Sequence, residues 1–128
     1  MTTIRPRSLP GLATDLNLAV VRGRLSSEPN RRELPSGDVV VQYEVTVRSD
    51  TGPAESVPVA RFTNGRVPAL HEGDEVVVTG RVRRRFFRAG SSTASRTEIV
   101  AESVVAAAKT TMCEKAVDRA LSPLLDEP

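Results

Sequence analysis

The residues best suited to chemistry lie between Glu75 and Phe87. This stretch has the composition of a β-strand, and alternation places one set of side chains on a common face if a bulge at Gly80 leaves the phase intact. The set contains Arg81, Arg83, Arg85 and Phe87. Guanidinium groups neutralise phosphates and stack on flat rings, and an aromatic side chain provides a stacking platform. The chemistry expected of this face is therefore non-covalent binding of a flexible polyanion that carries flat groups.

Catalytic and metal-binding chemistry has little support elsewhere in the chain. There is one histidine, His71, and one cysteine, Cys113, which excludes His–His, Cys–His and disulfide pairing within one chain. The run 71–75 has no second histidine and is interpreted as a turn before a strand. We therefore expect no enzymatic activity, no metal and no cofactor.

The charge distribution has two explanations. The net charge is only +2, yet 16 of the 18 basic residues are arginine, and no acidic residue occurs between Val76 and Thr97. A basic stripe of this kind is typical of surfaces that bind polyanions. A GC-rich genome that encodes arginine by default accounts for the composition equally well, so composition alone leaves both explanations open.

Length and hydropathy indicate one domain. The 128 residues, 39% of them hydrophobic, suffice for a single core. No stretch approaches the roughly 18 apolar residues of a membrane helix, and residues 1–18 lack the apolar run of a signal peptide. We expect a cytoplasmic protein without membrane contact. The expected organisation is a flexible N-terminal arm (1–15), a β domain (16–106) and a C-terminal helical extension (107–128).

Five segments have the composition or periodicity of strands. The clearest is 39–47, in which valine or tyrosine occupies every second position. The others are 16–25, 55–62, 75–87 and 97–105. The residues between them are rich in glycine, proline and small polar side chains, which predicts turns and loops. These connecting segments are 26–38, 49–54, 63–74 and 88–96.

The strands predict an all-β fold. The chain lacks the amphipathic helices that a parallel βαβ arrangement requires. Five antiparallel strands avoid long exposed edges by closing into a small barrel. The expected fold is a five-stranded antiparallel OB-fold barrel with a short C-terminal α-helix.

Phe62 lies outside the core phase of Val57 and Val59. On spacing alone, Phe62 and Phe87 are either stacking platforms or a cover for the barrel mouth.

The C-terminal segment has the pattern of an amphipathic helix. Thr111 and Glu114 match a capping box, and Pro123 limits the helix end. One apolar stripe follows at helical spacing. Its members are Met112, Cys113, Ala116, Val117, Ala120, Leu121 and Leu124. Because so short a helix is marginal by itself, we expect the stripe to dock on the barrel or on another subunit.

Residues 17–105 resemble the bacterial single-stranded DNA-binding protein family. The matching segments occur in the family's order and at its approximate spacing. They are 17–25 (NLAVVRGRL), Pro29, Arg32, 35–37 (PSG), 57–62 (VPVARF), 70–74 (LHEGD), 76–83 (VVVTGRVR) and 97–104 (TEIVAESV). The resemblance implies an OB fold, oligomerisation, often as a tetramer, and sequence-tolerant binding of single-stranded DNA in replication, repair or recombination. It also implies a nucleoid-associated location.

The resemblance implies roles for individual residues as well. Phe62 and Phe87 fall where the family places two base-stacking aromatics. Two further stacking positions fall near Thr51 and Ser56, which are not aromatic, so binding is expected to depend on arginine more than on stacking. The residues expected to contact DNA are Arg24, Arg48, Arg61, Phe62, Arg81, Arg83, Arg85 and Phe87. The family's acidic, apolar tail tip is matched only by a short reversed run, 124–128, which suggests a divergent, tail-shortened paralogue.

Two functional classes remain open. The first is single-stranded DNA binding and protection by a homo-oligomer, a dimer or tetramer, with a protein partner at the C-terminal helix. The second is an OB-fold interaction or scaffold protein that has lost most DNA binding and acts through oligomerisation or that helix. The missing aromatics favour the second class, which Phe62 and Phe87 packed inward would support.

Overall fold

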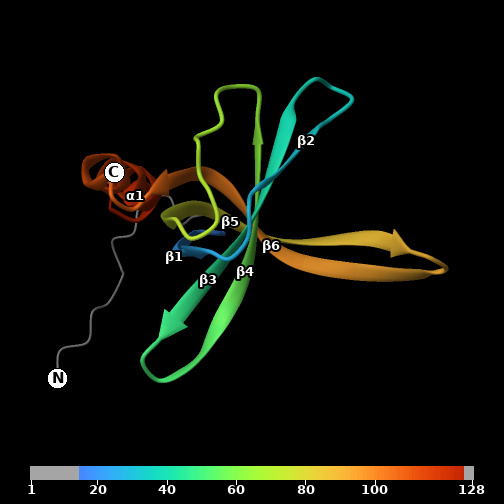
Figure 1. The fold of residues 1–128 in the computed structure, drawn as a ribbon, viewed down its shortest axis with the longest axis horizontal. Helices are drawn as coiled ribbons and strands as arrows, with labels where there is room; N and C mark the ends of the chain where they lie inside the picture. The colour runs from blue at the N-terminus through green and yellow to red at the C-terminus, as the bar shows by residue number, and fades with distance from the viewer. Residues whose placement is uncertain (1–14, 126–128) are drawn as a thin grey trace.

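The computed structural model describes residues 15–125. Within this range the chain forms six strands followed by one helix (Figure 1). The elements are β1 (Ala19–Leu25), β2 (Asn30–Glu33), β3 (Val39–Ser49), β4 (Gly52–Thr63), β5 (Glu75–Ala89), β6 (Ser92–Ala106) and α1 (Thr110–Leu125). The expected N-terminal arm, except for Asp15, lies outside the described residues.

The strands close into a ring. The sheet order is β1-β5-β6-β4-β3-β2, and β1 also pairs with β3, so five strands form a closed circuit. Strand β2 pairs with the same edge of β3 as β1, nearer the start of β3. The pairing of β4 with β6 is parallel, and the other strand pairs are antiparallel. Closure removes the unpaired edges that a small open sheet would expose. The predicted five-stranded, mostly β fold is confirmed.

The core fills the interior of the ring. Strand alternation sends every second side chain inward, as Val41, Tyr43 and Val45 of β3 show, each at most 2% exposed. Other inward residues come from the remaining ring strands and from the connector before β5. They include Leu25, Val59, Leu70, Val76, Val78, Ile99, Ala101 and Val104. This apolar filling fixes the register of each strand, because a one-residue slip would expose it.

Two predicted loops are wrong. The segment 88–96 belongs largely to a long hairpin, because β5 continues to Ala89 and β6 begins at Ser92 (Figure 1). The segment 26–38 contains β2, whose four residues are all exposed. Neither piece buries an apolar face, so hydrophobic alternation gives no signal there. Backbone hydrogen bonds to the neighbouring strand, which do not depend on side-chain type, hold both pieces in the sheet.

A bulge beside Gly80 preserves the alternation of β5. Thr79 pairs with Ser103, whereas Gly80 pairs with Ala101, so the extra residue, Glu102, belongs to β6. Side chains of β5 therefore keep the same two faces before and after the bulge. A Cβ atom at Gly80 would lie 2.1 Å from the Val100 carbonyl oxygen, which requires glycine at this crossing.

Replacing Gly80 by alanine is expected to destabilise the domain. The added Cβ meets backbone atoms, which cannot move aside as a flexible side chain can. Overpacking of this kind costs about 1–3 kcal/mol in the free energy of unfolding. Gly52→Ala is the control, since a Cβ at Gly52 has no neighbour within 4 Å. Equal thermal stability of the two variants would contradict the close strand approach at Gly80.

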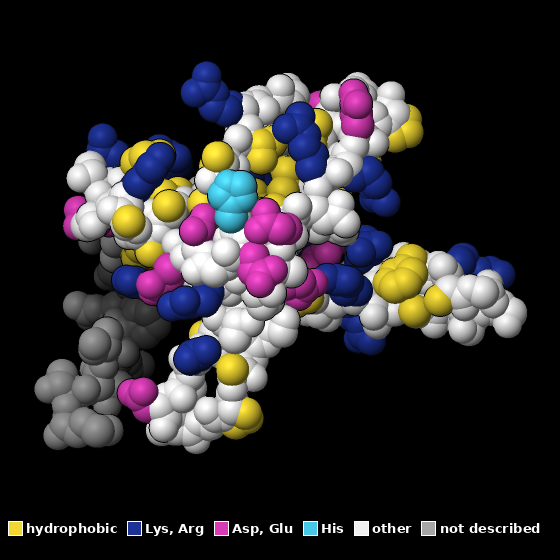
Figure 2. Space-filling view, in the orientation of Figure 1, with side chains coloured by type: hydrophobic (Ala, Val, Ile, Leu, Met, Phe, Trp, Pro, Cys, Tyr) yellow, Lys and Arg dark blue, Asp and Glu magenta, His cyan; other side chains and the backbone are white. Residues whose placement is uncertain are grey.

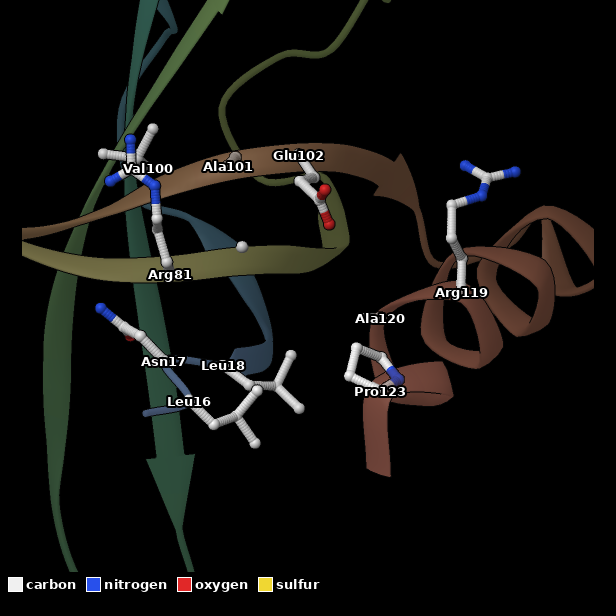
Figure 3. A pocket seen from close by; sticks show the side chains of 11 residues that line it. Leu16, Asn17, Leu18, Arg81, Val100, Ala101, Glu102, Arg119, Ala120 and Pro123 are labelled. Atoms are coloured by element: carbon white, nitrogen blue, oxygen red, sulfur yellow. The ribbon is translucent and has the colours of Figure 1, made fainter. Parts of the chain in front are cut away.

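Helix α1 packs against β5 and β6. Ala116 and Ala120 are buried, which confirms that the apolar stripe docks on the barrel. Figure 3 shows Arg119, Ala120 and Pro123 of α1 opposite the segment that leads into β1, across a cavity of about 450 Å³. The small alanine side chains allow the helix to approach the sheet closely.

Candidate nucleic-acid interface

Two exposed aromatic rings and two arginines share one face of the barrel. The Cζ atom of Arg83 on β5 lies 5.4 Å from the centroid of the Phe62 ring on β4. Further along β5, the Cζ atom of Arg85 lies 5.2 Å from the centroid of Phe87. Phe62 is 45% exposed and Phe87 39% exposed. The rings therefore face solvent with a guanidinium group over each, rather than packing inward.

Glu98 joins the arginines of this face. It is 3% exposed and accepts hydrogen bonds from Nη2 of Arg83 at 2.6 Å and from Nε of Arg85 at 3.3 Å. Burial alone would raise the pKa of the Glu98 carboxyl, but the arginine hydrogen bonds and charges outweigh burial and hold this pKa below its ordinary value. The carboxylate thus fixes both guanidinium groups on the same face as the two rings.

A second carboxylate extends this network across the sheet. Nη2 of Arg96 on β6 donates to Oε1 of Glu44 on β3 at 2.6 Å, and Nε of Arg96 lies 4.0 Å from Oε1 of Glu98. The Ser56 hydroxyl of β4 donates to Oε2 of Glu44 at 3.1 Å. Four strands are linked in this way. We call the set Arg83, Arg85, Arg96, Glu44 and Glu98 the arginine–glutamate network.

The opposite face of the β5–β6 hairpin carries a similar pair. The Cζ atom of Arg84 lies 5.3 Å from the centroid of Phe86, which is 65% exposed. Nη2 and Nε of Arg84 also donate to the Ser95 hydroxyl at 3.2 Å and 3.3 Å. Figure 2 shows dark-blue and yellow side chains alternating along this hairpin, which extends to the right. Strand alternation alone places Arg84 and Phe86 on one face, although neither residue is among the expected DNA contacts.

The structure does not bring all the expected DNA contacts together. Arg81 follows the same alternation as Arg83 and lines the cavity of Figure 3. Arg24 lies on β1, where its Cα pairs with Glu75 of β5 and Thr46 of β3. Arg61 and Phe62 are consecutive in β4, so their side chains leave opposite faces.

Arg48 is also distant from the aromatic face. It lies eight residues along β3 from Val40, the Cα partner of Phe62. Eight residues of extended strand span about 26 Å.

Tyr43, the one tyrosine, is buried in the core. This burial raises the pKa of its hydroxyl, although the charge of nearby Arg61 opposes the change. The compact part of the predicted site therefore consists of Phe62, Arg83, Arg85 and Phe87.

An exposed ion pair lies near the start of β5. Nδ1 of His71 is 3.1 Å from Oε1 of Glu28, whose other oxygen accepts a hydrogen bond from the Glu72 amide. The hydrogen bond and charge of Glu28 raise the pKa of His71 above its ordinary value. The Glu72 amide, followed by His71, lowers the pKa of Glu28. The pair thus links the β1–β2 connection to the turn before β5.

Glu28→Gln is expected to return the pKa of His71 towards its ordinary value. Because the pKa of His71 is higher in the folded protein than in the unfolded chain, protonation of His71 stabilises the fold. This stabilisation is complete below the unfolded pKa and is lost as pH rises through the folded pKa. NMR titration of the imidazole signals measures the pKa of His71 in the variant and in the unaltered protein. Glu33→Gln, an exposed change on β2, is the control. An unchanged His71 titration in Glu28→Gln would show that the pair does not form in solution.

Other kinds of site are not evident in residues 15–125. No group of three histidine, cysteine, aspartate or glutamate side chains there is close enough to hold a metal ion. The one helix in that range is not long and apolar enough to cross a membrane.

A closed five-stranded ring with exposed aromatic and arginine side chains defines an oligonucleotide-binding, or OB-fold, protein. The model of the single-strand binding protein family matches residues 16–107. The chain therefore belongs to this family, whose members bind single-stranded DNA without enzymatic activity. The comparison with curated proteins found no match.

Proposed function

We propose that the protein binds and protects single-stranded DNA, with little sequence preference, during replication, repair or recombination. The observation that carries this proposal is the common face of Phe62 and Phe87, each exposed and each under an arginine. Bases stack on the rings while the guanidinium groups meet phosphates. Every base has a flat face, so such contacts do not select a sequence, and no chemistry is performed on the DNA.

The DNA path centres on the β4–β5–β6 face. Arg81 provides a further phosphate contact along β5. Arg24, Arg48 and Arg61 lie apart from this face, so contacts with them require a strand that continues around the barrel. We infer that DNA reaches them only in a wrapped complex.

Affinity depends more on charge than on stacking. The family resemblance expects further aromatics near Thr51 and Ser56, and the Ser56 hydroxyl donates a hydrogen bond to Glu44. Each stacked base contributes about 1–3 kcal/mol, so two missing platforms lower the affinity considerably. Arginine contacts with phosphates release counterions, and binding therefore weakens steeply as salt increases.

Phe62 and Phe87 also bear on the scaffold alternative. A protein that has lost DNA binding has no need of exposed rings, yet both are more than a third exposed. Family membership favours a homo-oligomer, a dimer or tetramer, acting at the nucleoid in the cytoplasm. Helix α1 lies beyond the family match and is proposed as the surface for a protein partner.

Fluorescence anisotropy of labelled oligo-dT tests the proposal. The oligonucleotide is titrated with protein at several salt concentrations, with duplex DNA as competitor. Tight, salt-sensitive binding that duplex DNA does not displace is the expected result. No binding even at low salt would favour the scaffold alternative. Intact oligonucleotide after incubation with magnesium is expected of a non-enzymatic protein, and cleavage would contradict that expectation.

Arg83→Ala is expected to lower both the affinity for oligo-dT and its salt dependence. Loss of one phosphate contact reduces the slope of log K against log salt by about 0.7 for a single strand. Arg22→Ala is the control, because it removes the same charge. Arg22 pairs with Val77, six residues and about 20 Å along β5 from Arg83. Equal effects of the two substitutions would show that Arg83 acts only through net charge.

A further inference from the structure

We propose that a cavity under α1 binds a peptide segment of a partner protein in which acidic and aliphatic side chains are combined. This inference rests on the proposed role of α1 as a partner surface and adds the chemistry of that partner. The cavity, about 790 Å³ in volume, lies between α1, the end of β6 and the connector from β4 to β5. Its size is that of a binding pocket rather than a packing defect.

The charge of the cavity lining is entirely positive. Its cations are Arg61, Arg66, Lys109, Lys115 and Arg119, and no carboxylate lines it. Both lysines of the chain are in this set. Cations that surround one cavity without a carboxylate make its electrostatic potential positive, which attracts an anionic ligand. The complementary partner is therefore acidic.

Helix α1 directs one stripe of its side chains towards the cavity. Met112, Lys115 and Arg119 recur at intervals of three and four residues and line the cavity. Glu114 and Asp118 each precede one of these cations by a single residue, and neither acid lines the cavity. Because successive residues are about 100° apart around a helix, the acids lie beside the cation stripe, and the charge that α1 adds to the cavity lining is positive.

The floor of the cavity is aliphatic. Val67, Pro68 and Leu70 line it from the connector, and Met112, which is 53% exposed, lies on the α1 side. No aromatic side chain lines the cavity, so bases have no platform there. Aliphatic side chains of a peptide fit this floor, and an exposed methionine adapts to their shape. Apolar contacts below and cations around them favour an acidic, aliphatic peptide over nucleic acid.

The cavity differs from the aromatic face in position and in origin, and Arg61 is the one of its cations that a wrapped DNA strand would also reach. Arg61 lines the cavity, whereas its neighbour Phe62 leaves the opposite face of β4. Lys109, Lys115 and Arg119 follow the last residue matched by the family model. The proposed peptide site is thus a property of this chain that α1 adds to the OB domain.

A fluorescein-labelled peptide of alternating aspartate and leucine tests the inference on the full chain. Anisotropy is expected to show saturable binding, which is lost when asparagine replaces aspartate or serine replaces leucine in the peptide. Lys115→Glu is expected to weaken binding about tenfold or more, as loss of a central contact does. Arg88→Glu makes the same charge change on the distant β5–β6 hairpin and is expected to leave peptide binding unchanged.

Oligo-dT affinity is measured on the same variants, so that failure of the peptide site and failure of DNA binding are distinguished. Lys115 is exposed, and circular dichroism verifies that its substitution leaves the fold intact. Unchanged oligo-dT binding in Lys115→Glu is the expected result. No peptide binding by the unaltered protein would overturn the inference. It would also be overturned if oligo-dT displaced the peptide and Lys115→Glu weakened both ligands equally, because the cavity would then belong to the DNA path.

Discussion

Replacement of Phe62 and Phe87 by alanine is expected to cause the largest loss of DNA affinity of any change on the barrel surface. Each ring removed costs about 1–3 kcal/mol of binding free energy, so the double variant should bind oligo-dT only weakly. Both rings are exposed, and their removal leaves no core cavity. The fold should therefore be retained. Anisotropy of labelled oligo-dT at one fixed salt concentration measures the effect.

Phe86→Ala is the matched control for this experiment. Phe86 lies on the same hairpin, is more exposed than Phe87 and also lies under an arginine, but it occupies the opposite face. Phe86→Ala is expected to lower the oligo-dT affinity much less than Phe87→Ala does. If Phe86→Ala had the larger effect, DNA would lie on the other face of the hairpin, and the proposed contacts of Arg83 and Arg85 would be wrong.

Glu98→Gln is expected to have opposite effects on stability and on DNA binding. The carboxylate is buried among arginines, and glutamine removes its charge without changing its shape. Loss of one partner from a fully buried ion pair costs about 3–5 kcal/mol, and because these arginines are about a third exposed we expect about 2 kcal/mol. The freed guanidinium groups meet phosphates without competition, so oligo-dT affinity should rise.

The stability of the unaltered protein should also depend on Glu98 in acid. The folded pKa of this carboxyl is lower than that of the unfolded chain. Its contribution to stability is therefore complete above the unfolded pKa and is lost as pH falls through the folded pKa. Urea unfolding of Glu98→Gln and of the unaltered protein across this acidic range measures the difference. Glu102→Gln, an exposed change on the same strand, is the control. A variant with unchanged stability and unchanged oligo-dT affinity would show that Glu98 does not hold the arginines in solution.

The aromatic rings and the arginine–glutamate network are different parts of one surface. The rings provide stacking area, and the arginine–glutamate network determines how much positive charge is free to meet a phosphate. Because Glu98 competes with DNA for Arg83 and Arg85, Glu98→Gln should bind oligo-dT more tightly than the unaltered protein does. The same carboxylate keeps the guanidinium groups over the rings, which limits the conformational entropy lost on binding.

Local patterns in the sequence predicted the five strands of the ring and the composition of the binding face. The alternation in 39–47 predicted β3 because a half-buried strand needs an apolar residue at every second position. The same period placed Arg83, Arg85 and Phe87 on one face, and the structure agrees because the bulge adds its extra residue to β6 rather than β5. The apolar stripe at helical spacing from Met112 to Leu124 likewise predicted α1, and two of its alanines are buried.

Only the tertiary structure decided which distant residues meet. Glu98 lies between two arginines because the β5–β6 register pairs it with Arg83, and a register is a property of two strands together. The β3–β4 register placed Arg48 eight residues along β3 from the Cα partner of Phe62, although both residues were expected in one groove. The cavity under α1 likewise combines cations from β4, a connector and a helix. Periodicity within a segment reports the face of each side chain, whereas contacts between segments depend on register and closure, which packing of the whole core determines.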